Sequence, residues 1–278
     1  MLYHKDVQGT ESHVRHVENT FLFLQEPNAF CRRRFQCEPK YKHIIPMGRA
    51  CQIVIHLQRN GLRKCAYPFD ATRTTFESLK AVLQNDLEDF FTKEVIVPDE
   101  KFIEAFVRQG NHAWFPVINT RYNINFPHAF KSREHFLHSF AEVEAAFRRR
   151  TIRMFAALDS GDSTLLVRYH ISKAEAAELR DIIRRKFPCA RFDVLAINDA
   201  DVVCHDWQLE NVIPYRMALA AGTHAMDPAF DANWRRLYLR VLYTGTVPKL
   251  FFVIRFFFYR CVRLVGRLRM RMCDMRGS

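Results

Sequence analysis

Cys51 is the residue of this sequence whose position best suits covalent chemistry. It follows the glycine Gly48, between a short apolar segment at residues 42–47 and a stretch with helical spacing at residues 50–60. A thiol in the first helical turn lies beside unpaired backbone N–H groups and the positive end of the helix dipole, and both favour the thiolate. Gly48 allows a tight turn, and N–H groups around Gln52 are candidates to bind an oxyanion. The alternative role for Cys51, which these residues alone favour, is a small packing residue beneath the helix start.

The Cys51 segment is the first of several motifs that follow one another along the chain. They are Gly-Arg-Ala-Cys-Gln-Ile-Val at 48–54, Leu-Gln-Arg-Asn-Gly-Leu-Arg at 57–63, Tyr-Pro-Phe-Asp at 67–70, Asn-Asp-Leu-Glu-Asp-Phe at 85–90, Phe-Pro-His-Ala-Phe at 126–130 and Leu-Leu-Val-Arg at 165–168. Over roughly residues 44–198 this ordered set resembles a bacterial family of uncharacterised proteins that are classified as papain-like cysteine peptidases. The chain departs from the family pattern at two positions. Ala71 stands where an aromatic residue is usual, and Ala129 stands where an acidic residue is frequent.

The resemblance implies that Cys51 is a nucleophile and that His128 is its general base. A neutral imidazole near pH 7 can accept the proton of a thiol. Asp70, in the third motif, is the candidate to hold the imidazole ring through its second N–H group. Simpler roles stay open, because His128 also suits a helix cap or packing residue and Asp70 suits a turn acceptor.

Strands and helices alternate along the part of the chain that contains these residues. Ser172 begins a capping box and a helix that extends to residue 186, between apolar strands at residues 164–169 and 191–197. This βαβ unit predicts parallel pairing with a right-handed crossover. Other expected elements are a helix capped at residues 74–77 that continues to residue 90, strand-like segments at 114–118 and 122–126, and helices at 132–158 and 233–243. The predicted fold class is therefore α/β, a largely parallel sheet flanked by helices.

The two ends of the chain differ from its centre in composition, and this difference suggests three regions. We expect an N-terminal extension at 1–40, an α/β domain at 41–243 and a basic, aromatic C-terminal tail at 244–278. The net charge is +12, and residues 241–278 hold seven arginines and one lysine against a single aspartate. The apolar run at 250–259 is too short to span a bilayer, so residues 245–278 are predicted to form a basic amphipathic helix on an anionic membrane surface. A helix docked on the domain is the alternative.

Composition limits the cellular setting and the partners. No hydrophobic signal region opens the sequence, and no pair of the eight cysteines has C-x-x-C spacing, so we expect a cytoplasmic protein without a metal or cofactor. A peripheral location at the inner membrane face is the further option. No nucleic-acid-binding motif is present. An arginine cluster, Arg148, Arg149, Arg150 and Arg153, is expected to be a solvated helix face, with binding of phosphate or carboxylate groups as the alternative.

The predicted function is thiol-dependent hydrolysis of a peptide or amide substrate, with Cys51 as nucleophile and His128 as base. Two other classes stay open. The first is a non-catalytic binding module acting near membrane or glycan partners. The second is an α/β transferase in which the Gly48 turn binds an anionic group of its ligand, and the βαβ pattern favours this class over a papain-like layout.

Overall fold

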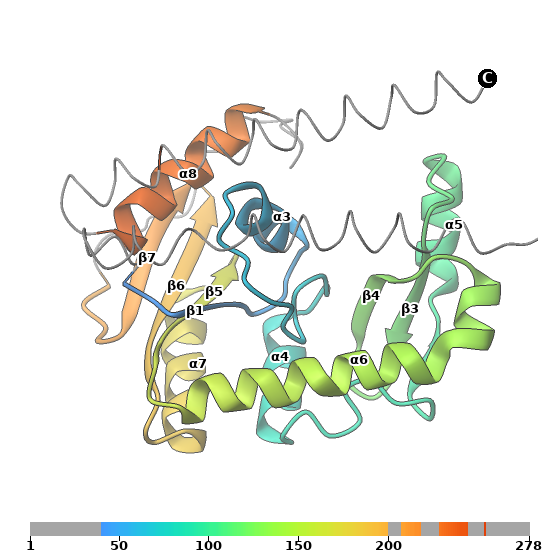
Figure 1. Ribbon diagram of the computed structural model, residues 1–278, viewed down its shortest axis with the longest axis horizontal. Helices are drawn as coiled ribbons and strands as arrows, with labels where there is room; N and C mark the ends of the chain where they lie inside the picture. Colours follow the sequence, from blue (N-terminus) through green and yellow to red (C-terminus); the bar gives the residue numbers. More distant parts are fainter. Residues whose placement is uncertain (1–39, 200–206, 218–227, 244–252, 254–278) are drawn as a thin grey trace, which may run out of the picture.

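The computed structural model describes residues 40–199, 207–217, 228–243 and 253 (Figure 1). The predicted N-terminal extension at 1–40 and the C-terminal tail at 244–278 lie outside these residues, apart from Lys40 and Val253. Their boundaries and the membrane contact of the tail therefore stay predictions. Within the described part of the chain, no helix combines the length and the apolar character that crossing a membrane requires.

A four-stranded sheet forms one side of the molecule, and all its neighbouring strands are parallel. The strand order is β1 (His43–Pro46), β5 (Ser163–Tyr169), β6 (Arg191–Asp199) and β7 (Val212–Met217). Helix α7 (Lys173–Lys186) connects β5 to β6 and begins at Ser172 with both hydrogen bonds of the capping box. The predicted βαβ unit and the predicted fold class are confirmed.

Helices cover both faces of this parallel sheet, which is why the middle residues of its two central strands, Leu165–Val167 and Val194–Ile197, are apolar. Leu165 and Val167 of β5 pack in one cluster with α3 (Gln52–Arg59) and α8 (Pro228–Leu242). Leu166, which lies between them in sequence, packs on the opposite face with α7. The start of α3 therefore has a fixed place at one end of β1, and α3 carries its apolar side against the sheet (Figure 1).

A second, antiparallel sheet was only partly anticipated. Its order is β2 (Ile96–Pro98), β3 (Phe115–Asn119) and β4 (Ile124–Phe130). The expected strands at 114–118 and 122–126 correspond to β3 and β4, whereas β2 and the following helix α5 (Glu100–Arg108) were not predicted. Strand β4 also continues through His128, so this histidine lies within a strand and not after one.

Two further helices join the sheets. Helix α6 (Arg133–Asp159) begins at Ser132, whose side chain accepts the His135 amide, and runs along the molecule past both sheets (Figure 1). Helix α4 (Phe76–Gln84) begins at Thr75 and ends before the expected residue 90. Positive φ angles at Asp86 and Leu87 turn the chain out of the helix there.

Phenylalanine rings fill the space between α6 and the antiparallel sheet. Phe91 lies nearly parallel to Phe147 with ring centroids 4.1 Å apart, and it meets Phe126 edge-on at 4.9 Å. Phe140 stacks on its other side at 5.7 Å. Such contacts add stability beyond the burial of area alone. The cluster therefore fixes β4, and with it His128, against α6.

Truncation of Phe91 is expected to be costly, because the ring is 4% exposed and contacts several other rings. We predict that Phe91→Ala lowers the free energy of unfolding by about 3–5 kcal/mol in urea titrations. Leu137→Ala on α6 is the control, since Leu137 is 67% exposed and its loss should change stability by less than about 0.5 kcal/mol. A loss below about 1 kcal/mol for Phe91→Ala would contradict this view of the core.

Candidate active site

The chain turns sharply between β1 and α3, and Gly48 makes this turn possible. Gly48 and Arg49 both have positive φ, at 77° and 79°. A Cβ atom on residue 48 would overlap the hydroxyl of Thr74 and lie 3.1 Å from that of Thr72. Any larger residue would therefore meet both backbone strain and a steric clash. The turn needs glycine because another part of the chain packs directly against it.

Cys51 lies at the N-cap position of α3 and is half-buried. Its side chain does not cap the helix. Among the residues that the structure describes, none accepts a hydrogen bond from the amides of Gln52 or Ile53. These two donors are the unpaired N–H groups that a helix start leaves available. The Cys51 sulfur is thus next to amides that suit a developing oxyanion.

The Cys51 thiol is less acidic than its position at a helix start suggests. Burial raises its pKa, while hydrogen bonding to its own backbone and the positive charge of Arg73 oppose that rise. The rise prevails, so the resting group is the neutral thiol. This corrects the expectation from sequence, which took account of the helix start and left out the loss of solvent around sulfur.

The segment Asp70–Thr74 connects the Cys51 turn to the strand that carries His128. On one side, the Thr74 hydroxyl accepts the Arg49 amide at 3.0 Å. On the other, Arg73 and Asn125 of β4 exchange two backbone hydrogen bonds, at 2.9 and 3.1 Å. The positive charge of Arg73 acts to lower the pKa of Cys51. Its guanidinium lies 4.8 Å from the centroid of the Phe102 ring on α5. One short segment therefore fixes both halves of the candidate site.

Arg168 of β5 lies beneath this junction and is only 1% exposed. Its Nη1 donates to the carbonyl of Met47 at 2.6 Å and to the hydroxyl of Thr74 at 2.7 Å, and its Nη2 donates to the Thr74 carbonyl at 3.0 Å. Burial lowers its pKa to about 10. Among the described side chains, no carboxylate forms an ion pair with it, so neutral oxygens hold this buried cation.

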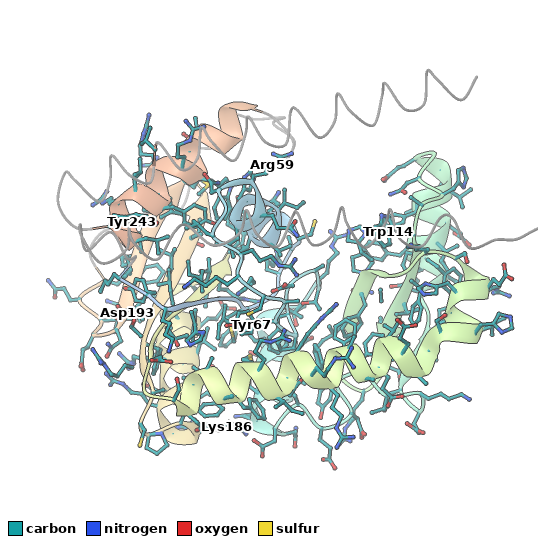
Figure 2. All side chains as sticks on the ribbon, viewed as in Figure 1. Arg59, Tyr67, Trp114, Lys186, Asp193 and Tyr243 are labelled. Atoms are coloured by element: carbon teal, nitrogen blue, oxygen red, sulfur yellow. The ribbon has the colours of Figure 1, made fainter. Side chains whose placement is uncertain are left out.

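His128 is half-buried and is held by aromatic rings. Phe106 of α5 stacks on it at 6.2 Å, and Trp114 meets it edge-on at 5.1 Å. Figure 2 shows Trp114 on the side of the molecule that carries α5. Burial lowers the pKa of His128, so its imidazole is neutral at pH 7. Its Nδ1 is buried and has no partner among the described residues, and no hydrogen bond joins it to Cys51 there.

Asp70 is engaged by an arginine and not by His128. Its Oδ2 accepts hydrogen bonds from Nε and Nη2 of Arg63, at 3.0 and 2.5 Å. Its carboxyl group is buried, which raises its pKa, and Arg63 opposes that rise. In the structure the turn that carries Cys51 and the strand that carries His128 both hydrogen-bond to the Asp70–Thr74 segment. The described contacts of the His128 ring are with Phe106 and Trp114, and none of them is with Asp70.

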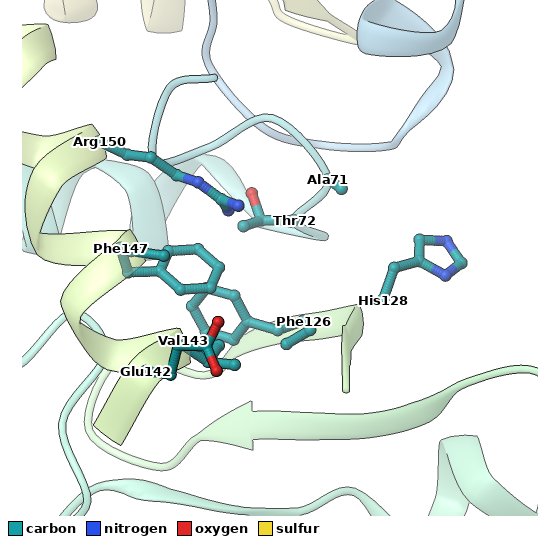
Figure 3. A pocket seen from close by; sticks show the side chains of 10 residues that line it. Ala71, Thr72, Phe126, His128, Glu142, Val143, Phe147 and Arg150 are labelled. Carbon is teal, nitrogen blue, oxygen red and sulfur yellow. The ribbon is translucent and has the colours of Figure 1, made fainter. Parts of the chain in front are cut away.

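A cavity of about 150 Å³ adjoins His128, between β4, α6 and the Asp70–Thr74 segment (Figure 3). Ala71 and Ala129 both line it. Arg150 also lines it, whereas Arg148 and Arg149 are exposed. The expectation of a solvated arginine face therefore holds for part of the cluster only.

Two important arginines were missed by sequence reasoning. Arg73 directly precedes the expected helix cap at residues 74–77, and nothing in the local sequence connects it with a thiol. Arg168 did carry a signal, because it is the one charged residue inside the apolar strand at 163–169. A charge at a buried strand position requires partners, so it marks a place where another segment must approach.

A comparison with protein families gives one match. The family model described as "Putative papain-like cysteine peptidase (DUF1796)" matches residues 42–192, which is more than half of the chain. The matched range includes Cys51, the Asp70–Thr74 segment, His128 and Arg168. No curated protein and no solved structure matches the chain significantly.

The raised pKa of Cys51 predicts slow alkylation at neutral pH. We expect iodoacetamide to label Cys51 more slowly than the exposed Cys189 at pH 7.5, because burial raises the pKa of Cys51 and restricts access to its sulfur. The rate at Cys51 should rise steadily with pH and should still be rising above pH 9. Peptide mapping by mass spectrometry measures both cysteines in one sample. Faster labelling at Cys51 than at Cys189 at pH 7.5 would show that the resting group is a thiolate.

Replacement of Arg168 is expected to release the junction beneath Cys51. Arg168→Lys cannot reproduce three hydrogen bonds to Met47 and Thr74, and it leaves buried acceptors unpaired. We predict a loss of about 3 kcal/mol in the free energy of unfolding, measured in urea. Arg149→Lys on exposed helix surface is the matched control and should leave stability unchanged. Equal stability of the two variants would exclude the anchoring role.

Proposed function

Since the chain belongs to the family of putative papain-like cysteine peptidases, we propose that it is a thiol-dependent hydrolase of amide or peptide bonds. Cys51 is the nucleophile and His128 is the general base. The observation that carries the proposal is the docking of the Cys51 turn and the His128 strand onto the same segment, Asp70–Thr74.

The reaction begins from a neutral pair. As the Cys51 sulfur attacks the substrate carbonyl, its proton passes to the neutral imidazole of His128. The amides of Gln52 and Ile53 stabilise the negative oxygen of the tetrahedral intermediate. The imidazolium then gives the proton to the leaving amine, and a thioester to Cys51 forms. Water, activated by the same imidazole, hydrolyses the thioester and frees the acid.

The two pKa shifts favour this order of events. A raised thiol pKa and a lowered imidazole pKa both disfavour a resting thiolate–imidazolium ion pair. Proton transfer is therefore coupled to attack and does not precede substrate binding. Catalysis also requires His128 to come within hydrogen-bond reach of the sulfur, a contact that tightens in many enzymes only when the substrate is bound.

Substitution of the two proposed catalytic residues tests the function. Wild-type protein is incubated with a mixed library of fluorogenic peptide amides, and turnover is compared with that of three variants. Cys51→Ala should abolish turnover, and His128→Gln should lower it by about 10²–10⁴-fold, because it removes the base. Cys65→Ala removes a half-buried thiol outside the proposed site and should retain full turnover. Turnover that persists in Cys51→Ala would contradict the proposal.

A further inference from the structure

The cavity beside His128 has polar groups at its two ends and an apolar middle. One face of α6 forms its long wall, with Glu142, Val143, Phe147 and Arg150 following one another along the helix. Figure 3 shows the Arg150 guanidinium pointing toward Thr72, above the rings of Phe147 and Phe126. With a volume of about 150 Å³, the cavity has room for one short side chain and not for a long peptide segment.

Arg150 directs unused hydrogen-bond donors into this space. None of the described residues accepts a hydrogen bond from its guanidinium, although the group lines the cavity and is half-buried. The guanidinium lies over the ring of Phe147, 4.6 Å from the ring centroid, which restricts its orientation. A planar guanidinium held in this way matches a carboxylate, which can accept two parallel N–H bonds.

Positive charge predominates around Arg150. The Asp70 carboxylate attracts the Arg150 guanidinium, but its hydrogen bonds come from Arg63, and Arg63 and Arg153 add further positive charge. Glu142, the carboxylate that lines the other end of the cavity, is exposed and lies eight residues from Arg150, about 12 Å along the helix axis.

We infer that this cavity is the side-chain pocket of the proposed hydrolase and that it selects an acidic side chain, whose carboxylate binds Arg150. The substrate class is therefore a peptide or amide with a glutamate or aspartate beside the bond to be cleaved. Ala71, Thr72 and Ala129 are small residues that line the cavity together with His128, whose ring lies at its edge and points away from Arg150 (Figure 3). The inference rests on the proposed function, because it places the pocket beside the proposed general base.

Two covalent probes that differ in one group test this specificity. Both are peptidyl acyloxymethyl ketones, with glutamate in one and glutamine in the other at the residue that carries the ketone. The Cys51 sulfur forms a bond to the methylene carbon, the acyloxy group leaves as a carboxylate, and mass spectrometry locates the label. In the wild type we expect the glutamate probe to label Cys51 about tenfold or more faster than the glutamine probe, since a charge-assisted hydrogen bond is lost in the latter.

Variants of neighbouring arginines supply the matched control. Arg150→Gln should bring the glutamate-to-glutamine rate ratio close to one, while Arg149→Gln on exposed surface should keep the wild-type ratio. Arg150→Lys retains the positive charge but loses the planar guanidinium, so this variant should keep part of the preference for the glutamate probe. A thermal unfolding scan of each variant identifies any loss of fold. The glutamate-to-glutamine rate ratio of the wild type tests the specificity even if a variant does not fold.

The outcomes separate the inference from the proposed function. If both probes label Cys51 of the wild type at equal rates, the acidic specificity is wrong and the thiol hydrolase stands. If neither probe labels Cys51 while iodoacetamide labels Cys189 in the same sample, the proposed function fails, and the pocket assignment fails with it. A ratio that survives in Arg150→Gln would place the recognition of the carboxylate elsewhere.

Discussion

The candidate site depends on one buried cation. Arg168 has no carboxylate partner among the described residues, so the cost of its desolvation is offset by hydrogen bonds to Met47 and Thr74. Those bonds hold together the turn before Cys51 and the Asp70–Thr74 segment. The segment in turn pairs with β4, which carries His128. Without the cation, the hydrogen bond from the Arg49 amide to the Thr74 hydroxyl would remain, but the three bonds that Arg168 donates to this junction would be lost.

Burial determines the chemistry that this arrangement supports. The partial loss of solvent acts on both groups in the direction that removes charge, raising the pKa of the thiol and lowering that of the imidazole. Because Asp70 is bound to Arg63, no acid stabilises an imidazolium in the described part of the chain. Both shifts fit the proposed transfer of a proton during attack. The described contacts of the His128 ring are with the aromatic rings of Phe106 and Trp114.

Elements with strong local signals were predictable from the sequence. The βαβ unit, the capping box at Ser172 and the cap at Ser132 were all foreseen, because local patterns fix them. The cap of α4 was expected one residue early, since the Thr74 hydroxyl is used by Arg168 and Thr75 caps instead. Asp70 was predicted from its motif to hold the His128 ring, whereas in the structure its carboxylate binds Arg63. That pairing depends on how the chain folds and has no local sequence signal. Helix α5 was missed although Phe102, Ile103 and Phe106 form an apolar side, from which Ile103 packs against the core and Phe106 stacks on His128.

The central claim is that Cys51 and His128 act on one proton. It is tested most directly by the pH dependence of the rate at which an uncharged peptidyl acyloxymethyl ketone traps Cys51, in the wild type and in His128→Gln. We predict that the wild-type rate falls in acid with a midpoint below pH 6.5, the ordinary pKa of histidine, and that the rate of the variant shows no fall with this midpoint. Identical pH profiles for the two proteins would show that His128 does not serve Cys51.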